Sequence, residues 1–260
     1  MKNNNKFRLD VWGAITLGTI ALYALFLIYP MAYLIRQSVL DPDTGSFTLA
    51  YFTKFFSKSY YFDTLINSFK VSITATVLSI AIGTPLAYLF TIFKIKGKSV
   101  LNILIVVASM SAPFIGAYSW ILLLGRSGVI TTYFKNLGIA IPDIYGFGGI
   151  VLVMTLQLFP LVFLYAKGAL KNIDNSLIEA AENLGCSGIA CFFKVVVPLI
   201  MPTLLAAALL VFMRSFADFG TPMLIGEGYR TFPVVLYTEF INEVGGSDGF
   251  AAAIAVIAIV

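Results

Sequence analysis

The sequence predicts an all-α protein, a polytopic bundle of about six membrane-spanning helices with a cytoplasmic N-terminus. Of its 260 residues, 59% are hydrophobic and only 12% are charged, and the mean hydropathy is +0.92, far above the range of soluble chains. The apolar residues form long runs separated by short polar segments, as expected of helices that cross a bilayer. We therefore expect one membrane domain over residues 1–260.

The first apolar run follows a polar arm, residues 1–10, and extends from Val11 to about Leu34. A secretory signal peptide would have an apolar region of about 7 to 15 residues before a small-residue cleavage site. The run here is longer and ends in the bulky sequence 29–31, so it is predicted to be a span. The next segment, 36–63, is predicted to be a polar loop whose aromatic residues suit a membrane interface.

The second run, from about Leu65 to Phe93, is unusually rich in small and hydroxyl-bearing residues. Lipid-facing positions do not need such residues, whereas helix contacts and polar paths do. We favour helix packing, with pore lining as the alternative. The residues concerned are Ser72, Thr74, Thr76, Ser79, Gly83 and Thr84.

Three further runs are predicted to span, at about 100–124, at about 147–166, and from Pro198 and Pro202 to near Phe216. Polar side chains inside them are costly in hydrocarbon unless they meet water or a partner, so they are candidates for lining a translocation path. The final run, 250–260, would rise only about 16 Å as a helix, half of the hydrocarbon core, so we expect the chain to stop inside a sixth span. The candidate path residues are Ser109, Ser111, Thr155 and Gln157.

The segment after the fifth run, 214–249, is predicted to be a loop with a dense group of charges. Arg214 and Asp218 are four residues apart, which favours a local ion pair at a helix end. The alternative is that the two residues contact a substrate at the outer mouth of the path, where Asp218 would meet an entering cation.

A short charged stretch, 176–202, interrupts the apolar runs and is the part of the chain best suited to touching another protein. Ser176 and Glu179 form a capping-box pattern, which predicts a helix from Leu177, and Gly185 can provide a left-handed C-terminal cap. A helix of about two turns is marginal alone, so it needs a docking surface. Its apolar side is Leu177, Ala180, Ala181 and Leu184.

Composition argues against several other classes of protein. The chain has no histidine, which removes the commonest general base and metal ligand, and we expect no catalytic, cofactor or metal site. Cys186 and Cys191 match neither a redox pair nor a zinc framework. The sequence Gly97-Lys98-Ser99 lacks the first glycine of a phosphate-binding loop, and a net charge of +4 does not indicate nucleic-acid binding.

Positive charges predict the orientation. With the N-terminus inside, short inner segments carry more than half of the 17 Lys and Arg residues, which satisfies the positive-inside rule. The same orientation places 176–202 in the cytoplasm. The inner cations are Lys2, Lys6, Arg8, Lys94, Lys96, Lys98, Lys167, Lys171 and Lys194.

The stretch resembles the EAA loop (E-A-A-x3-G-x9-I-x-L-P) of binding-protein-dependent ABC importer permeases, with Val195 and Val197 at the two aliphatic positions. The resemblance implies a cytoplasmic coupling helix that docks on a separate ABC ATPase dimer, so that this chain itself is no enzyme. The alternative is an ordinary amphipathic loop helix. The coupling residues implied are Glu179, Ala180, Ala181, Leu184, Gly185 and Pro198.

The wider sequence is most similar to ferric-iron-type permeases, in 67–68 and 83–88 of the second run and in 217–222. This resemblance implies a bacterial inner-membrane protein that works with an extracytoplasmic binding protein, a second permease half and membrane lipid. It also implies that the chain is the N-terminal half of a longer, possibly fused permease. Spermidine/putrescine, thiamine and phosphonate remain alternative substrates, and a passive channel or membrane enzyme is the alternative class. Arg214, Asp218 and the four polar residues of the spans, predicted above from their positions in the sequence, are the candidates for its path.

Overall fold

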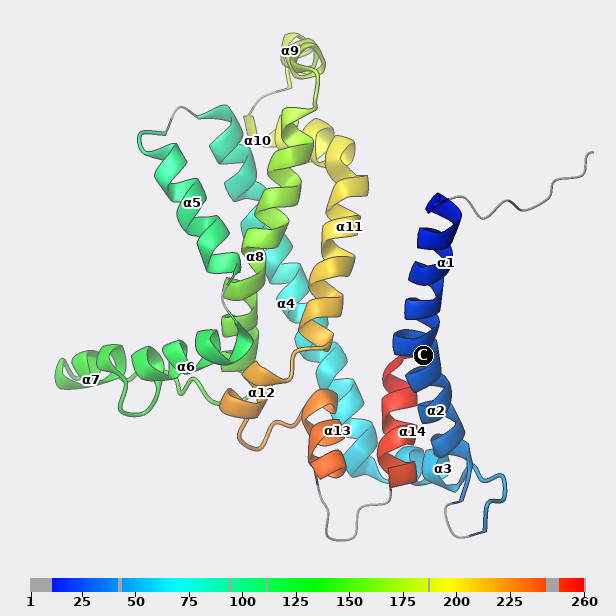
Figure 1. The fold of residues 1–260 in the computed structure, drawn as a ribbon. Helices are drawn as coiled ribbons and strands as arrows, with labels where there is room; N and C mark the ends of the chain where they lie inside the picture. Colours follow the sequence, from blue (N-terminus) through cyan, green and yellow to red (C-terminus); the bar gives the residue numbers. More distant parts are fainter. Residues whose placement is uncertain are drawn as a thin grey trace, which may run out of the picture. The chain divides into compact units, whose positions relative to one another are not determined.

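The computed structural model describes residues 11–41, 44–93, 95–110, 112–186, 188–241 and 248–259 (Figure 1). This part of the chain is helical, with a single isolated bridge between Leu40 and Phe47 and no strand, so the predicted all-α class is confirmed. It divides into two compact units, 1–62 with 236–260 and 63–235. Five helical stretches in it are long and apolar enough to cross a membrane: Val11–Val39, Ser59–Ile92, Pro113–Asn136, Phe147–Lys171 and Gly188–Phe216.

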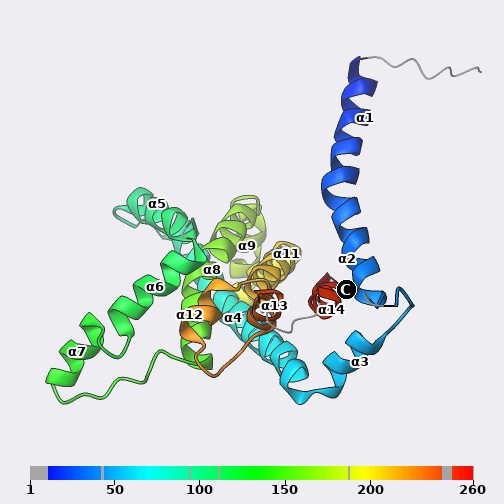
Figure 2. The ribbon, with the colours of Figure 1, turned by 60° about the horizontal axis from the view of Figure 1, so that its bottom comes forward.

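The first unit contains the N-terminal helix and the last helix of the chain. In this unit α14 packs along α2 and contacts α3 (Figure 2). Its core is aromatic: the ring of Tyr61 lies 5.0 Å from that of Phe250 and 5.9 Å from that of Phe55. Tyr51 packs so closely on Gly249 that a Cβ there would lie 2.6 Å from the ring. The helices are α1 (Val11–Tyr23), η1 (Ala24–Ile28), α2 (Tyr29–Val39), α3 (Ala50–Ser57) and α14 (Asp248–Ile259).

The second unit is built on α4, α8 and α11, whose apolar faces share one core. Helices α4 and α13 both pass from one unit into the other. The helices that begin, end or lie in this unit are α4 (Ser59–Ile92), α5 (Lys98–Ser109), α6 (Pro113–Leu124), α7 (Val129–Asn136), α8 (Phe147–Lys171), α9 (Asn175–Asn183), α10 (Gly188–Cys191), η2 (Phe192–Val196), α11 (Val197–Phe216), α12 (Gly220–Ile225) and α13 (Phe232–Ile241).

The two π-helical turns, η1 and η2, each end just before a Tyr-Pro or Val-Pro pair. The amide of Tyr29 donates to the carbonyl of Ala24, and the amide of Val197 donates to that of Phe192. The prolines that follow, Pro30 and Pro198, have no amide hydrogen and crowd the carbonyl four residues earlier. A widened turn before the proline relieves that conflict and keeps the helix continuous.

The third predicted span is not one helix. It is divided into α5 and α6 at Ala112, whose backbone is extended because the next residue is Pro113. The apolar pattern continues through the break, so hydropathy alone could not locate it. The division matters for function because it brings two helix ends to one place in the unit.

Most of the hydroxyl-bearing residues singled out in α4 are buried, which supports the predicted role in helix packing. Ser72, Ser79 and Thr84 are buried, and a Cβ at Gly83 would lie 2.8 Å from the Cβ of Val162 in α8. Small side chains let two helices approach closely in a bilayer.

Two segments that were predicted to be loops contain helices. Segment 36–63 holds α3 and the start of α4, and segment 214–249 holds α12 and most of α13. The sixth apolar run forms α14, whose 12 residues are too few to cross a bilayer as a helix.

Candidate functional site: an exposed helix and a polar cavity

The short helix α9 begins earlier than the capping-box pattern predicted. It starts at Asn175, and the backbone amide of Ser176 donates to Oδ1 of Asp174 over 3.0 Å. Asp174 therefore caps the helix in place of Ser176, and the predicted start at Leu177 was wrong. The hydrogen bond from the Ser176 amide, followed by one from its side chain, lowers the pKa of the Asp174 carboxyl.

The predicted C-terminal cap of α9 is confirmed. Gly185 has a φ of +84°, and the amide of Cys186 donates to the carbonyl of Ala181 over 3.0 Å. This is the Schellman arrangement, in which a left-handed residue reverses the chain at the end of a helix. Gly185 thus fixes the direction in which the chain leaves α9 towards α10.

Only one side of helix α9 packs against the rest of the described chain. Ile178 packs against the core formed by α4, α8 and α11. Leu177 and Leu184 lie on the predicted apolar side and are 50% and 90% exposed, and Glu179 and Ala180 are also exposed. The side that the sequence predicts to dock is therefore the side that this chain leaves uncovered.

A cavity of about 470 Å³ with a mixed apolar and polar lining lies in the second unit, at the ends of α5, α11 and α12. It brings together four residues that the sequence predicted for the translocation path: Ser109, Gln157, Arg214 and Asp218. An adjoining hollow of about 440 Å³ shares Ser109, Gln157 and Arg214. Residues from three separate runs of the sequence therefore meet at one place.

The other two predicted path residues are not placed in the cavity. Thr155 is 4% exposed and is absent from the lining; two positions along α8 from Gln157, it points to another side of the helix. Ser111 lies outside the described residues.

The predicted ion pair between Arg214 and Asp218 does not form. The Asp218 carboxylate instead accepts hydrogen bonds from the amides of Gly220 and Thr221 and, over 2.6 Å, from the Thr221 hydroxyl. Asp218, two residues before α12, therefore holds the first turn of that helix through its side chain. The spacing of four residues was misleading because helix α11 ends between Arg214 and Asp218. Burial raises the pKa of Asp218, although these hydrogen bonds oppose the shift.

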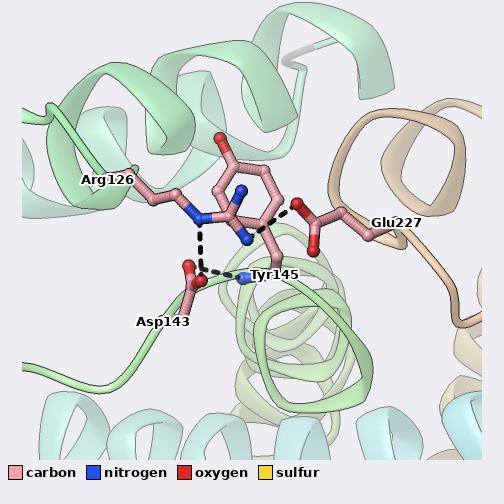
Figure 3. Close-up of polar contacts among 4 residues, drawn as sticks. All are labelled: Arg126, Asp143, Tyr145 and Glu227. Atoms are coloured by element: carbon pink, nitrogen blue, oxygen red, sulfur yellow. Dashed lines mark hydrogen bonds and ion pairs between the residues drawn. The ribbon is translucent and has the colours of Figure 1, made fainter.

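A cluster around Arg126 was not predicted from the sequence. Its guanidinium donates from Nε to Asp143 over 3.0 Å and from Nη2 to Glu227 over 2.8 Å, and it stacks on the ring of Tyr145 at 4.7 Å (Figure 3). Glu227 has a φ of +47°, a left-handed backbone that is rare for a residue with a side chain. We call these four residues the Arg126 clamp. It joins the end of α6, the segment before α8 and the turn after α12.

Among the described residues, no three His, Cys, Asp or Glu side chains lie close enough to hold a metal ion. Both cysteines are free thiols. Three features of the described chain are considered as functional candidates: the exposed helix α9, the cavity and the Arg126 clamp.

Comparison with solved structures supports the fold. Two bacterial alginate ABC transporter structures, one in complex with an alginate pentasaccharide-bound periplasmic protein, contain a chain similar to this one. The TM-scores are 0.77 and 0.70, each over 96% of this chain and about nine-tenths of the other, at 17% identity. At this identity the likeness establishes the fold alone.

Comparison with curated sequences finds relatives with two different cargoes. The chain is 28% identical over 231 residues to the putative ferric transport system permease protein FbpB 1 of Haemophilus influenzae, covering 88% of this chain and 36% of that protein. It is 28% identical to the spermidine/putrescine permease PotB of the same species, covering 96% of this chain and 89% of PotB. The chain spans about a third of the length of the ferric relatives that it matches.

The family pattern described as binding-protein-dependent transport system inner membrane component matches residues 46–260. The match includes α9, the cavity and the Arg126 clamp. Such a component is the membrane part of a transport system and not its ATPase. The chain belongs to this family of inner-membrane transport components.

Proposed function

We propose that this chain is the permease subunit of an ATP-driven importer, with α9 as the helix that couples it to a cytoplasmic ABC ATPase dimer. The observation that carries the proposal is the uncovered apolar side of α9, with Leu177 at 50% and Leu184 at 90% exposure. A nine-residue helix does not keep large apolar side chains in water without a partner surface. The resemblance to the EAA loop supports an ABC ATPase as that partner.

The geometry of α9 suits transmission of movement. Ile178 anchors it to the core that includes α11, while Gly185 and the residues after it lead directly into that helix through η2. A displacement of α9 by a partner would therefore be transmitted to α11, whose other end carries Arg214 at the cavity. Small Ala180 and Ala181 allow a partner surface to approach closely. Glu179 and Pro198 complete the proposed coupling set.

The orientation is part of the proposal. The positive charges favour a cytoplasmic N-terminus and a cytoplasmic α9, with the cavity end of α11 towards the outside. A soluble binding protein would deliver cargo there, and a second permease half, fused or separate, would complete the path within the lipid. The chain would then be one membrane domain of a longer or paired permease.

For the cargo we propose ferric iron, with a polyamine as the second candidate; thiamine and phosphonate remain weaker ones. The relatives support both of the first two, since the matched proteins include ferric and spermidine/putrescine permeases. The path would run along Ser109, Gln157, Arg214 and Asp218, with Ser111 and Thr155 as further predicted members.

Mutation of α9 in the complete complex tests the coupling role. Ala181→Arg and Gly185→Asp should leave the protein inserted and abolish transport and substrate-stimulated ATPase activity. Asn183→Arg is the matched control, since it adds the same side chain on another side of α9 and should have little effect. Wild-type stimulated ATPase activity in Ala181→Arg would refute the coupling assignment, and failure to co-purify an ATPase would favour a passive channel or membrane enzyme.

A further inference from the structure

The two charged side chains that line the cavity differ in whether their hydrogen-bonding groups are free to bind a ligand. Among the described residues, its charged lining side chains are Arg214 and Asp218. The Asp218 carboxylate is occupied by three hydrogen bonds from the first turn of α12. Arg214 has no hydrogen bond or ion pair to any residue in the described part of the chain. Of the two charged groups, Arg214 is therefore the one that is left free to bind a ligand.

A second donor in the cavity also lacks an acceptor. Nε2 of Gln157 is buried and makes no hydrogen bond, which is costly for an amide in the interior of a membrane protein. Gln157 lines the cavity and the adjoining hollow together with Arg214. The Ser109 hydroxyl donates to the carbonyl of Val106 over 2.6 Å, so its oxygen keeps acceptor capacity but its hydrogen is used.

A guanidinium without a protein partner and a buried amide N–H without an acceptor line one cavity, and together they match a ligand with anionic oxygen atoms. Guanidinium groups bind carboxylates and phosphates through paired N–H donors. A polyamine presents only N–H donors and positive charge, so it would leave Gln157 unsatisfied and be repelled by Arg214.

We propose that this cavity is a selectivity site that binds the anionic oxygen atoms of the cargo, so that the cargo crosses as an anion. The inference rests on the proposed importer function and narrows its substrate class. Ferric iron is a hard cation that is held by carboxylate and other oxygen ligands. Such a complex is an anion when the summed negative charge of its ligands exceeds the positive charge of the metal. Iron would therefore pass as an oxygen-ligated anionic complex.

Thiol labelling tests the field in the cavity without assuming any cargo. In the complete complex carrying Cys186→Ala and Cys191→Ala, Ser109→Cys places a thiol in the cavity lining. It is treated with two methanethiosulfonate reagents, one with a sulfonate and one with a trimethylammonium group. We expect faster reaction with the sulfonate reagent, and we expect Arg214→Gln to lower the rate ratio by roughly tenfold.

Lys135→Gln is the matched control, because it removes an exposed cation from α7 that does not line the cavity. It should leave the rate ratio unchanged. A ratio that does not respond to Arg214→Gln, or a thiol that neither reagent reaches, would overturn the proposal.

Uptake measurements separate this inference from the proposed cargo. The complex is assayed with radioactive ferric citrate and with radioactive spermidine. We expect uptake of ferric citrate to fall at least tenfold in Arg214→Gln and to be largely retained in Arg214→Lys. This result supports both the ferric cargo and the anion-binding cavity. An electropositive cavity in a complex that imports neither probe contradicts the ferric assignment alone, whereas spermidine uptake that Arg214→Gln leaves unchanged contradicts the anion site.

Discussion

Gly83 of α4 lies directly against Val162 of α8, and a Cβ at position 83 would be 2.8 Å from the valine Cβ and 2.9 Å from the carbonyl oxygen of Phe159. Two of the helices that form the core of the second unit therefore meet backbone to backbone at this point. No flexible side chain can move aside to make room.

Gly83→Ala should accordingly destabilise the second unit by about 1–3 kcal/mol, the usual cost of overpacking. The control is Gly168→Ala in α8, where an added Cβ meets nothing within 4 Å. Thermal unfolding of the detergent-purified protein measures both. Equal melting temperatures for the two variants would mean that α4 and α8 are not in this close contact.

Asp218→Ala should fray the start of α12, because the carboxylate that accepts the Gly220 and Thr221 amides is lost. N-terminal caps contribute about 0.5–2 kcal/mol, so hydrogen exchange at these two amides should accelerate severalfold to about thirtyfold. Arg214→Gln should leave both amides protected. If the two variants accelerate exchange equally, Arg214 and Asp218 act as a pair after all.

Arg126→Gln should loosen the segment before α8 and the turn after α12, since one guanidinium holds both Asp143 and Glu227. The clamp residues are about half exposed, so the effect on global stability should be small, and 1 M salt should weaken the wild-type clamp in the same way. Hydrogen exchange at Tyr145 and Glu227 reports the change, with Lys135→Gln as the control. Unchanged exchange in Arg126→Gln would show that the clamp does not hold these segments.

Labelling of single cysteines should reveal the orientation. In a background with Cys186→Ala and Cys191→Ala, Leu184→Cys should react with an impermeant maleimide only after the cells are opened, whereas Asp41→Cys and Arg230→Cys should react in intact cells. Lys96→Cys should behave like Leu184→Cys. Reaction of Leu184→Cys in intact cells would reverse the proposed topology.

Much of the fold follows from hydropathy, because a long apolar run has few alternatives in a bilayer. The break at Ala112 was missed since the run continues through it, and only Pro113 marks it. The cap at Asp174 was missed because Ser176 and Glu179 present a stronger local pattern, and local patterns do not show which of two candidate caps the chain will use.

The candidate site was predictable residue by residue but not as an arrangement. Ser109, Gln157 and Arg214 each stood out as polar groups in or beside apolar runs, yet their meeting depends on the packing of α5, α8 and α11. The Arg126 clamp had almost no local signal, because Arg126 and Glu227 are far apart in the sequence. Its traces in the sequence are an arginine just beyond an apolar run, an acid 17 residues later and a second acid in a distant turn.

Helix α1 and the turn η1 contain no buried residue, whereas α8 buries eleven of its side chains or glycines. The family pattern begins at residue 46, after this helix. A helix whose side chains meet hydrocarbon and not neighbouring residues is constrained by its total hydrophobicity and length, not by the order of its residues. Within Val11–Ile28, substitutions among Leu, Ile, Val and Phe should therefore be tolerated. We expect this part of the sequence to vary more among relatives than α8.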